Sequence, residues 1–196
     1  MPPPLPAKPE LDEHSHRAPG SGDPAMAGAP SGDAAGGDVL PLSSIDIAAV
    51  RALLAGHGIA LEIVGDGAPI PGSFWGDSEA GVIGTTVYVR ADTPVHSLLH
   101  EACHLIVAPA DRRERIHTDA SDSQAEEDAT CYLQIVLAGA LLGVGCARLC
   151  EDMDRWGYTF RLGSARAWFE HDAEDARAWL IERGLLDDTA AAKSRI

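Results

Sequence analysis

The chain has 196 residues and carries 30 acidic against 15 basic side chains, for a formal net charge of −15 at pH 7. Because phosphate binding needs a basic face, this charge argues against nucleic acid as a direct partner. The longest apolar run, residues 131–147, is interrupted by Gln134 and by glycines and is short for a bilayer span, which argues against a membrane protein.

The cysteines and the first residues of the chain indicate its compartment. Cys103, Cys131, Cys146 and Cys150 lie inside apolar helical patterns, which is typical of buried, reduced thiols rather than of a disulfide framework. Residues 1–4 have neither the basic start nor the apolar segment of a secretory signal. We therefore expect a cytoplasmic protein.

Composition divides the chain into three parts. Residues 1–40 are rich in Pro, Gly and Ala and have almost nothing large and apolar to bury, so we expect a disordered tail. Residues 41–186 carry the apolar periodicity of one folded domain. Residues 187–196 are expected to form a frayed C-terminus.

The first part of the domain predicts a helix and then a short antiparallel sheet. Ser43 or Ser44 is placed to cap a helix with one apolar face. Residues 59–64 and 82–90 alternate in side-chain type with the period of a strand. The turn-rich residues 65–80 separate the two expected strands.

The next segment, residues 93–109, predicts a buried helix. Thr93 is placed as its N-cap, and Pro94 takes the first helical position, where the missing N–H costs nothing. Apolar residues then follow at helical spacing until Pro109.

The remainder of the chain predicts mainly helices, each opened by a residue that can cap it. The expected elements are helices from Asp122 or Ser123 to about Leu142, from Cys146 to Asp154, from Ser164, and from Asp172 to Gly184, with a strand or extended arm at residues 156–160. The whole pattern predicts an α+β fold that is mainly helical, with the short antiparallel sheet packed beside the helix of residues 93–109.

That helix contains a metal-binding motif, His100-Glu101-Ala102-Cys103-His104. Residues four apart lie on the same face of a helix, so both imidazoles can bind one ion, with the carboxylate of Glu101 beside them. This HExxH pattern is typical of zinc hydrolases, in which the Glu takes a proton from the metal-bound water. The alternative is a pair of core histidines that are four residues apart without any metal.

A catalytic zinc site needs a third protein ligand. A histidine six residues after His104 is excluded because that residue is Ala110, but Glu126-Glu127-Asp128 follows at the start of the predicted core helix. Steps of three, four and seven residues from Glu126 reach small and apolar side chains, whereas those from Glu127 reach more polar ones, so we favour Glu126. Glu127 stays open as the ligand, and acidic residues also favour a helix N-terminus without any metal.

Two segments carry a resemblance to a known family. Residues 98–106, which hold the motif, and residues 125–132 together resemble the two signature segments of compact gluzincin-type metallopeptidases, most closely the ImmA/IrrE family. The second family segment reads Glu-Glu-x-Ala-Asn-x-Phe-Ala; here Thr130 stands in the place of its Asn and Tyr132 in the place of its Phe.

The resemblance implies a small metallopeptidase-like domain and a role for each motif residue. It gives ligand roles for Zn²⁺ to His100, His104 and Glu126, and the role of general base to Glu101. It also implies a protein or peptide substrate and, within that class, a regulatory protein such as a repressor.

The predicted activity is therefore that of a zinc-dependent hydrolase, most directly a peptidase. Zinc would lower the pKa of its bound water, and Glu101 would accept the proton as the water attacks a peptide carbonyl. The developing oxyanion needs a hydrogen-bond donor, and the sequence does not choose among His117, Tyr132, Tyr158 and Arg161.

Two other classes of protein fit the same sequence. One is a non-catalytic regulatory or interaction protein of metallopeptidase fold that keeps the zinc and cleaves nothing. The other is a structural domain that binds no metal. Metal content and turnover distinguish all three.

Overall fold

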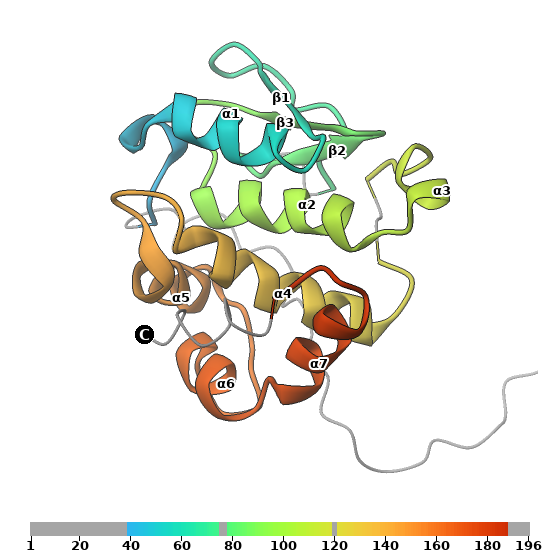
Figure 1. Cartoon of the computed structure of the whole chain (residues 1–196). Coiled ribbons are helices and arrows are strands. Elements are labelled where there is room, and N and C mark those ends of the chain that lie inside the picture. The colour runs from blue at the N-terminus through green and yellow to red at the C-terminus, as the bar shows by residue number, and fades with distance from the viewer. Residues whose placement is uncertain (1–38, 75–77, 119–120, 188–196) are drawn as a thin grey trace, which may run out of the picture.

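The computed structural model describes residues 39–74, 78–118 and 121–187, and within them the helices and strands form layers (Figure 1). The expected disordered tail, apart from its last two residues, and nearly all of the expected frayed C-terminus lie outside the described residues. Of the helices that the structure describes, none is both long and apolar enough to cross a membrane.

The three strands form a mixed sheet in the order β1-β3-β2. The strands are β1 (Ala60–Ile63), β2 (Gly81–Ile83) and β3 (Thr86–Val89), with β1 parallel and β2 antiparallel to β3. The sheet is therefore not purely antiparallel as we expected. The long connection between β1 and β2 allows β3 to lie alongside β1 in the same direction. The alternation of side chains within a strand does not indicate whether its neighbour is parallel or antiparallel.

The expected strand at residues 82–90 is in fact a hairpin made of β2 and β3. The chain reverses at Gly84 and Thr85, and Gly84 has a φ of 58°, a conformation that glycine adopts without strain. Apolar and polar side chains alternate on both sides of this two-residue turn, so the pattern predicted one continuous strand.

Helix α2 (Val95–Val107) carries the motif and is almost entirely buried. Twelve of its 13 residues are buried, and the exception is Glu101. One side of α2 contacts β2 and β3, and the other side contacts α4 (Figure 1). Pro94 is the N-cap, and the hydroxyl of Thr93, which we expected to cap the helix, accepts a hydrogen bond from the backbone N–H of Arg90 (2.9 Å) instead.

Helix α1 (Ile47–Ala55) lies against the sheet and contacts β1. Its N-cap is Asp46, whose carboxylate accepts a hydrogen bond from the backbone N–H of Ala48. The serines that we expected to cap it belong to a short 3-10 helix, Leu42–Ser44, one turn earlier.

The remaining elements of the described chain are helices. Ser123 caps α4 with its side chain, as predicted, and α4 packs along α2 as the central core helix. The helices are α3 (Ala110–Arg113), α4 (Gln124–Ala138), α5 (Gly145–Trp156), α6 (Ala165–His171) and α7 (Glu174–Glu182). The fold class, α+β and mainly helical, is thus confirmed.

Of the strand or extended arm expected at residues 156–160, the strand does not form. Trp156 is the last residue of α5, and the backbone then turns at Gly157, whose φ is 104°. No described strand pairs with the segment after it; the rings of Tyr158 and Phe160 stack on each other instead, with centroids 6.3 Å apart. Aromatic residues at alternate positions therefore reflect packing between rings in this segment.

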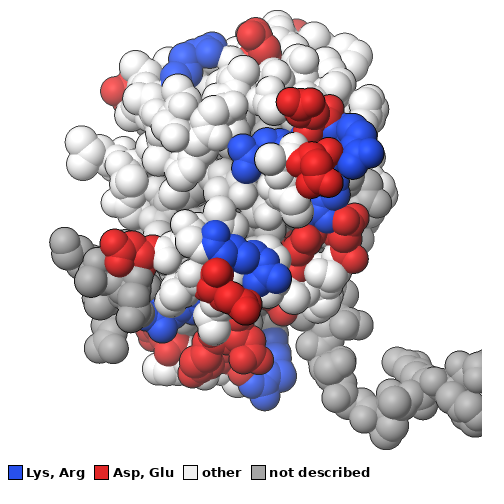
Figure 2. Space-filling model, turned by 45° about the vertical axis from the view of Figure 1, so that its right-hand side comes forward, with Lys and Arg blue, Asp and Glu red and all other residues white. Residues whose placement is uncertain are grey.

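Charged side chains of both signs are interspersed over the face shown in Figure 2. Oppositely charged residues of the described chain also form ion pairs, for example Arg90 with Asp92 and Arg166 with Glu170. Ion pairs of this kind contribute little to stability. The buried contacts around α2 and α4 therefore position the candidate site.

Candidate metal centre

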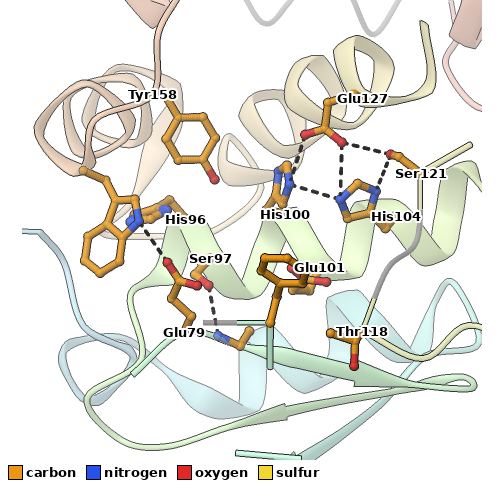
Figure 3. Close-up of a pocket in the computed structure, with 13 residues that line it drawn as sticks. Glu79, His96, Ser97, His100, Glu101, His104, Thr118, Ser121, Glu127 and Tyr158 are labelled. Atoms are coloured by element: carbon orange, nitrogen blue, oxygen red, sulfur yellow. Dashed lines mark hydrogen bonds and ion pairs between the residues drawn. The ribbon is translucent and has the colours of Figure 1, made fainter. Parts of the chain in front are cut away.

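His100, His104 and Glu127 converge on one point between α2 and α4 (Figure 3). The two histidines are on successive turns of α2, and their Nε2 atoms are 3.0 Å apart. Glu127 comes from the first turns of α4, with Oε1 3.3 Å from Nε2 of His100 and Oε2 3.6 Å from Nε2 of His104. All the potential donor atoms lie within 4.8 Å of one another.

The donor atoms have the chemistry and spacing of a tetrahedral metal site. Bonds of about 2.0–2.1 Å in a tetrahedron set neighbouring donor atoms about 3.3–3.4 Å apart. The distance between the two Nε2 atoms, and the distance from each of them to one of the two carboxylate oxygens of Glu127, lie close to that value. Two imidazole nitrogens and one carboxylate are also a ligand set that leaves a fourth position for water or substrate. These residues therefore fit a divalent ion such as Zn²⁺.

The structure places Glu127, and not Glu126, beside the histidines, which corrects our preferred third ligand. Glu126 instead accepts hydrogen bonds from the guanidinium of Arg112 (2.6 Å) and from the backbone N–H of Asp122 (3.0 Å). Our preference for Glu126 rests on the expectation that the inward face of α4 is its most apolar face. The side of α4 that carries Glu127 is polar instead: the hydroxyl of Thr130 lies 3.3 Å from Nδ1 of His104, and Gln134 donates a hydrogen bond to Sδ of Met153 on α5. Both side chains are fully buried.

Hydroxyl groups orient the second histidine. Nδ1 of His104 lies 3.2 Å from Oγ of Ser121 and 3.3 Å from Oγ1 of Thr130. Ser121 donates its own proton to Oε2 of Glu127 (2.9 Å), so its oxygen is left to accept a hydrogen bond from Nδ1–H of His104. A proton on Nδ1 leaves the lone pair of Nε2 directed at the centre, where a metal would need it.

Without a bound cation, burial and the charges of neighbouring groups shift the pKa values of His100, His104 and Glu127. Burial acts to raise the pKa of Glu127, but the charge and hydrogen bond of His100 lower it to about 2. Burial acts to lower the pKa of His100, yet Tyr158 and Glu127 raise it well above its ordinary value. Burial and the charge on His100 lower the pKa of His104 to about 3. The cluster thus holds one proton on His100, in the place that a metal cation would take.

Glu101 lies next to the triad and does not belong to it. Its side chain lines the same cavity, as the motif predicts for a base that does not bind the metal (Figure 3). Burial, together with the charges of Glu127 and Glu79, raises the pKa of Glu101 to about 7, although His100 opposes the shift. A carboxyl group with this pKa can both accept and release a proton at neutral pH.

A cavity of about 180 Å³ opens beside these groups. Its lining includes three carboxylates, and none of the described residues that line it is Lys or Arg. The lining residues are Phe74, Glu79, Ala80, His96, Ser97, His100, Glu101, His104, Thr118, Ser121, Glu127, Trp156 and Tyr158.

Of the four residues proposed as oxyanion donors, only Tyr158 lines this cavity. The other three do not line it and have other partners. Tyr132 stacks on Phe169, with centroids 4.6 Å apart, and Arg161 pairs with Asp172. Nδ1 of His117 lies 2.9 Å from the hydroxyl of Thr118. Tyr158 packs edge-on against His100, with centroids 5.9 Å apart, and burial raises the pKa of its hydroxyl well above the ordinary value. That hydroxyl is therefore a protonated donor at neutral pH.

The surroundings of the centre also include Ser121, Thr130, Glu79 and His96. The HExxH motif does not predict that these residues lie there.

The evidence for the candidate centre comes from the positions of the chain's own residues. Compared with known proteins, the chain matches no protein-family model, no curated protein and no solved structure.

Proposed function

We propose that the chain is a zinc-dependent hydrolase and, more narrowly, a peptidase. The observation that carries the proposal is the position of Glu101, a carboxylate beside a His-His-Glu triad and in the wall of the same cavity. A metal-binding protein without catalysis needs the triad but has no use for a second acidic group with a pKa near neutrality beside it.

Zinc is the metal that suits this site best. Imidazole nitrogen together with a single carboxylate is the ligand set of catalytic zinc in HExxH proteins, whereas Mg²⁺ and Ca²⁺ prefer oxygen ligands throughout. His100, His104 and Glu127 would hold the ion. When bound, zinc supplies a water acidic enough to lose its proton near pH 7.

The protein's own groups would then handle the proton and the developing charge. Glu101 accepts the proton from the attacking water on its carboxylate and passes it to the nitrogen of the leaving amine. The Tyr158 hydroxyl donates a hydrogen bond to the substrate oxygen as negative charge develops on it. Ser121 and Thr130 keep His104 in the tautomer that the site needs.

The resemblance to compact gluzincins of the ImmA/IrrE type supports the same reading. It rests on the motif helix and on the Glu-Glu pair of α4, of which the second, Glu127, stands beside the histidines here. By this resemblance the substrate is a protein or peptide, such as a regulatory protein. We also keep the proposal of a cytoplasmic location without direct nucleic-acid binding, and the four free cysteines support that location.

The experiment that tests the activity compares the wild type with Glu101→Gln on a mixture of unstructured peptides, after both proteins have been loaded with zinc. Cleavage by the wild type, with at least a hundredfold slower cleavage by the variant at equal zinc content, is the result we expect. Full activity in Glu101→Gln would contradict the mechanism. Zinc retention by both proteins without any cleavage would favour the non-catalytic regulatory protein.

A further inference from the structure

One carboxylate in the cavity has no part in the proposed reaction. Glu127 is a ligand and Glu101 is the base, which leaves Glu79. A divalent ion would offset the charge of its own ligand Glu127, and none of the described lining residues is Lys or Arg. The carboxylate of Glu79 therefore makes its own end of the metal-loaded cavity negative, whether or not Glu101 is ionised, and this favours a positively charged ligand there.

Neighbouring groups hold Glu79 in place at the end of the cavity away from His104 (Figure 3). Its Oε1 accepts a hydrogen bond from the indole N–H of Trp156 (3.2 Å). The next residue, Ala80, donates its backbone N–H to the hydroxyl of Ser97 on α2 (3.0 Å). Glu79 thus has a fixed position in the wall of the cavity.

His96 provides a second, independent sign of a ligand at this end. Its side chain is 1% exposed, it lines the cavity, and within the described part of the chain neither of its ring nitrogens has a hydrogen-bond partner. The rings of Trp156 and Tyr158 hold the imidazole, with centroids 5.0 Å and 5.7 Å away. Buried polar groups nearly always have partners, so a ligand in the cavity is the natural partner for His96.

The protonation state of His96 indicates what that ligand offers. Burial lowers the pKa of His96 to about 3, so the ring is neutral at physiological pH. A neutral imidazole has one nitrogen that accepts a hydrogen bond. An N–H group of a cation can donate to that nitrogen, while the carboxylate of Glu79, which the indole N–H of Trp156 holds in place, balances its charge.

We propose that Glu79, His96 and Trp156 form a subsite for a positively charged group of the substrate. That group is the α-ammonium of a peptide or the side chain of lysine or arginine, which present the same N–H donors and the same charge. The inference rests on the proposed function, because it takes the cavity as the place where a peptide binds.

Binding to the zinc-loaded, full-length Glu101→Gln protein tests this subsite without any turnover. Four probes form two pairs: trialanine and its N-acetylated form, and two acetylated tripeptides with lysine or norleucine at the centre. Isothermal titration calorimetry should show that the charged member of one pair binds about tenfold more tightly than its neutral partner. The pair that shows the difference tells whether the α-ammonium or the side chain occupies the subsite.

Glu79→Gln, added to the same protein, should abolish that difference. The amide oxygen still accepts the hydrogen bond of Trp156, so the variant should fold, and thermal unfolding checks that it does. The matched control is Glu62→Gln, which removes one charge from an exposed position on β1 and should leave the difference unchanged. His96→Phe keeps a ring between the aromatic side chains and removes the acceptor, so it should reduce the preference for the cation.

Equal binding of charged and neutral peptides would overturn the subsite, as would a preference that survives Glu79→Gln. Glu79 would then serve to position Trp156 through their hydrogen bond. The zinc content of each preparation is measured separately. Absence of zinc from the wild type, or the failure of all four peptides to bind, contradicts the proposed function and the subsite with it, whereas normal zinc and peptide binding with no preference for cations contradict the subsite alone.

Discussion

At the scale of single residues, Glu126 and Glu127 are neighbours with separate roles. Glu127 reaches the histidines of α2, whereas Glu126 pairs with Arg112 and fixes the backbone in front of α4. Consecutive residues of a helix point about 100° apart, so only one of the two can face α2. Side-chain direction, rather than acidity, decides which glutamate can bind a metal.

The third ligand is tested by replacing each glutamate in turn. Glu127→Ala should weaken zinc binding at least a hundredfold, because it removes one of three protein ligands. Glu126→Ala should change zinc affinity by less than about tenfold, because it removes only an ion pair outside the triad. Competition with a chromogenic chelator measures both affinities. The reverse order of the two effects would restore Glu126 as the ligand.

Ser121 gives a second prediction at this scale. Ser121→Ala removes the oxygen that faces Nδ1 of His104 and the hydroxyl that donates to Glu127. Loss of such a partner typically lowers metal affinity about 10- to 100-fold. The control, Ser43→Ala, removes an exposed hydroxyl on another part of the chain. The same chelator competition applies, and equal affinity in both variants would show that Ser121 does not orient the ligands.

At the scale of elements, the metal centre depends on the packing of α2. The sheet covers one side of this helix and α4 covers the other, so His100, His104 and Glu127 meet only while both contacts hold. Leu98, Leu99 and Leu105 are completely buried on α2. Burial of these large side chains keeps the ligands in register.

Leu105→Ala should therefore destabilise the fold by about 2–5 kcal/mol, because it leaves a cavity in a fully packed core. Leu142→Ala is the matched control: that side chain is 95% exposed, and its loss should change the free energy of unfolding by less than about 0.5 kcal/mol. Urea denaturation of the metal-free proteins measures both changes. Equal midpoints would show that α2 is not part of the core.

At the scale of the whole molecule, the sequence predicted which segments are helical better than it predicted which segments pack against one another. The motif helix was predicted because Pro94, the apolar spacing and the histidine pair all agree on one element. The direction of β1 against β3, and the closeness of Ser121 to His104, depend on how separate segments meet, and no local pattern records that. The apolar spacing of α4 predicted the wrong side of the helix as the one that faces α2. The side that faces α2 carries Glu127, and a group that could hold a metal ion makes a buried face polar.

The metal-free centre also predicts a proton balance for the whole protein. His100 has a raised pKa and is protonated at pH 7, whereas the lowered pKa values leave His104 neutral and Glu127 ionised. Zinc must therefore displace about one proton at pH 7, and its affinity should fall as the pH is lowered. Calorimetry in buffers of different ionisation enthalpy counts the proton. Binding without proton release would contradict this charge distribution.

The central claim is that α2 and α4 together hold a metal ion. Elemental analysis of the purified wild type beside His104→Ala tests it most directly. We predict about one zinc per chain in the wild type and its loss in the variant, because two remaining ligands do not retain the ion. No metal in either protein after zinc has been supplied, or equal zinc in both, would contradict the account.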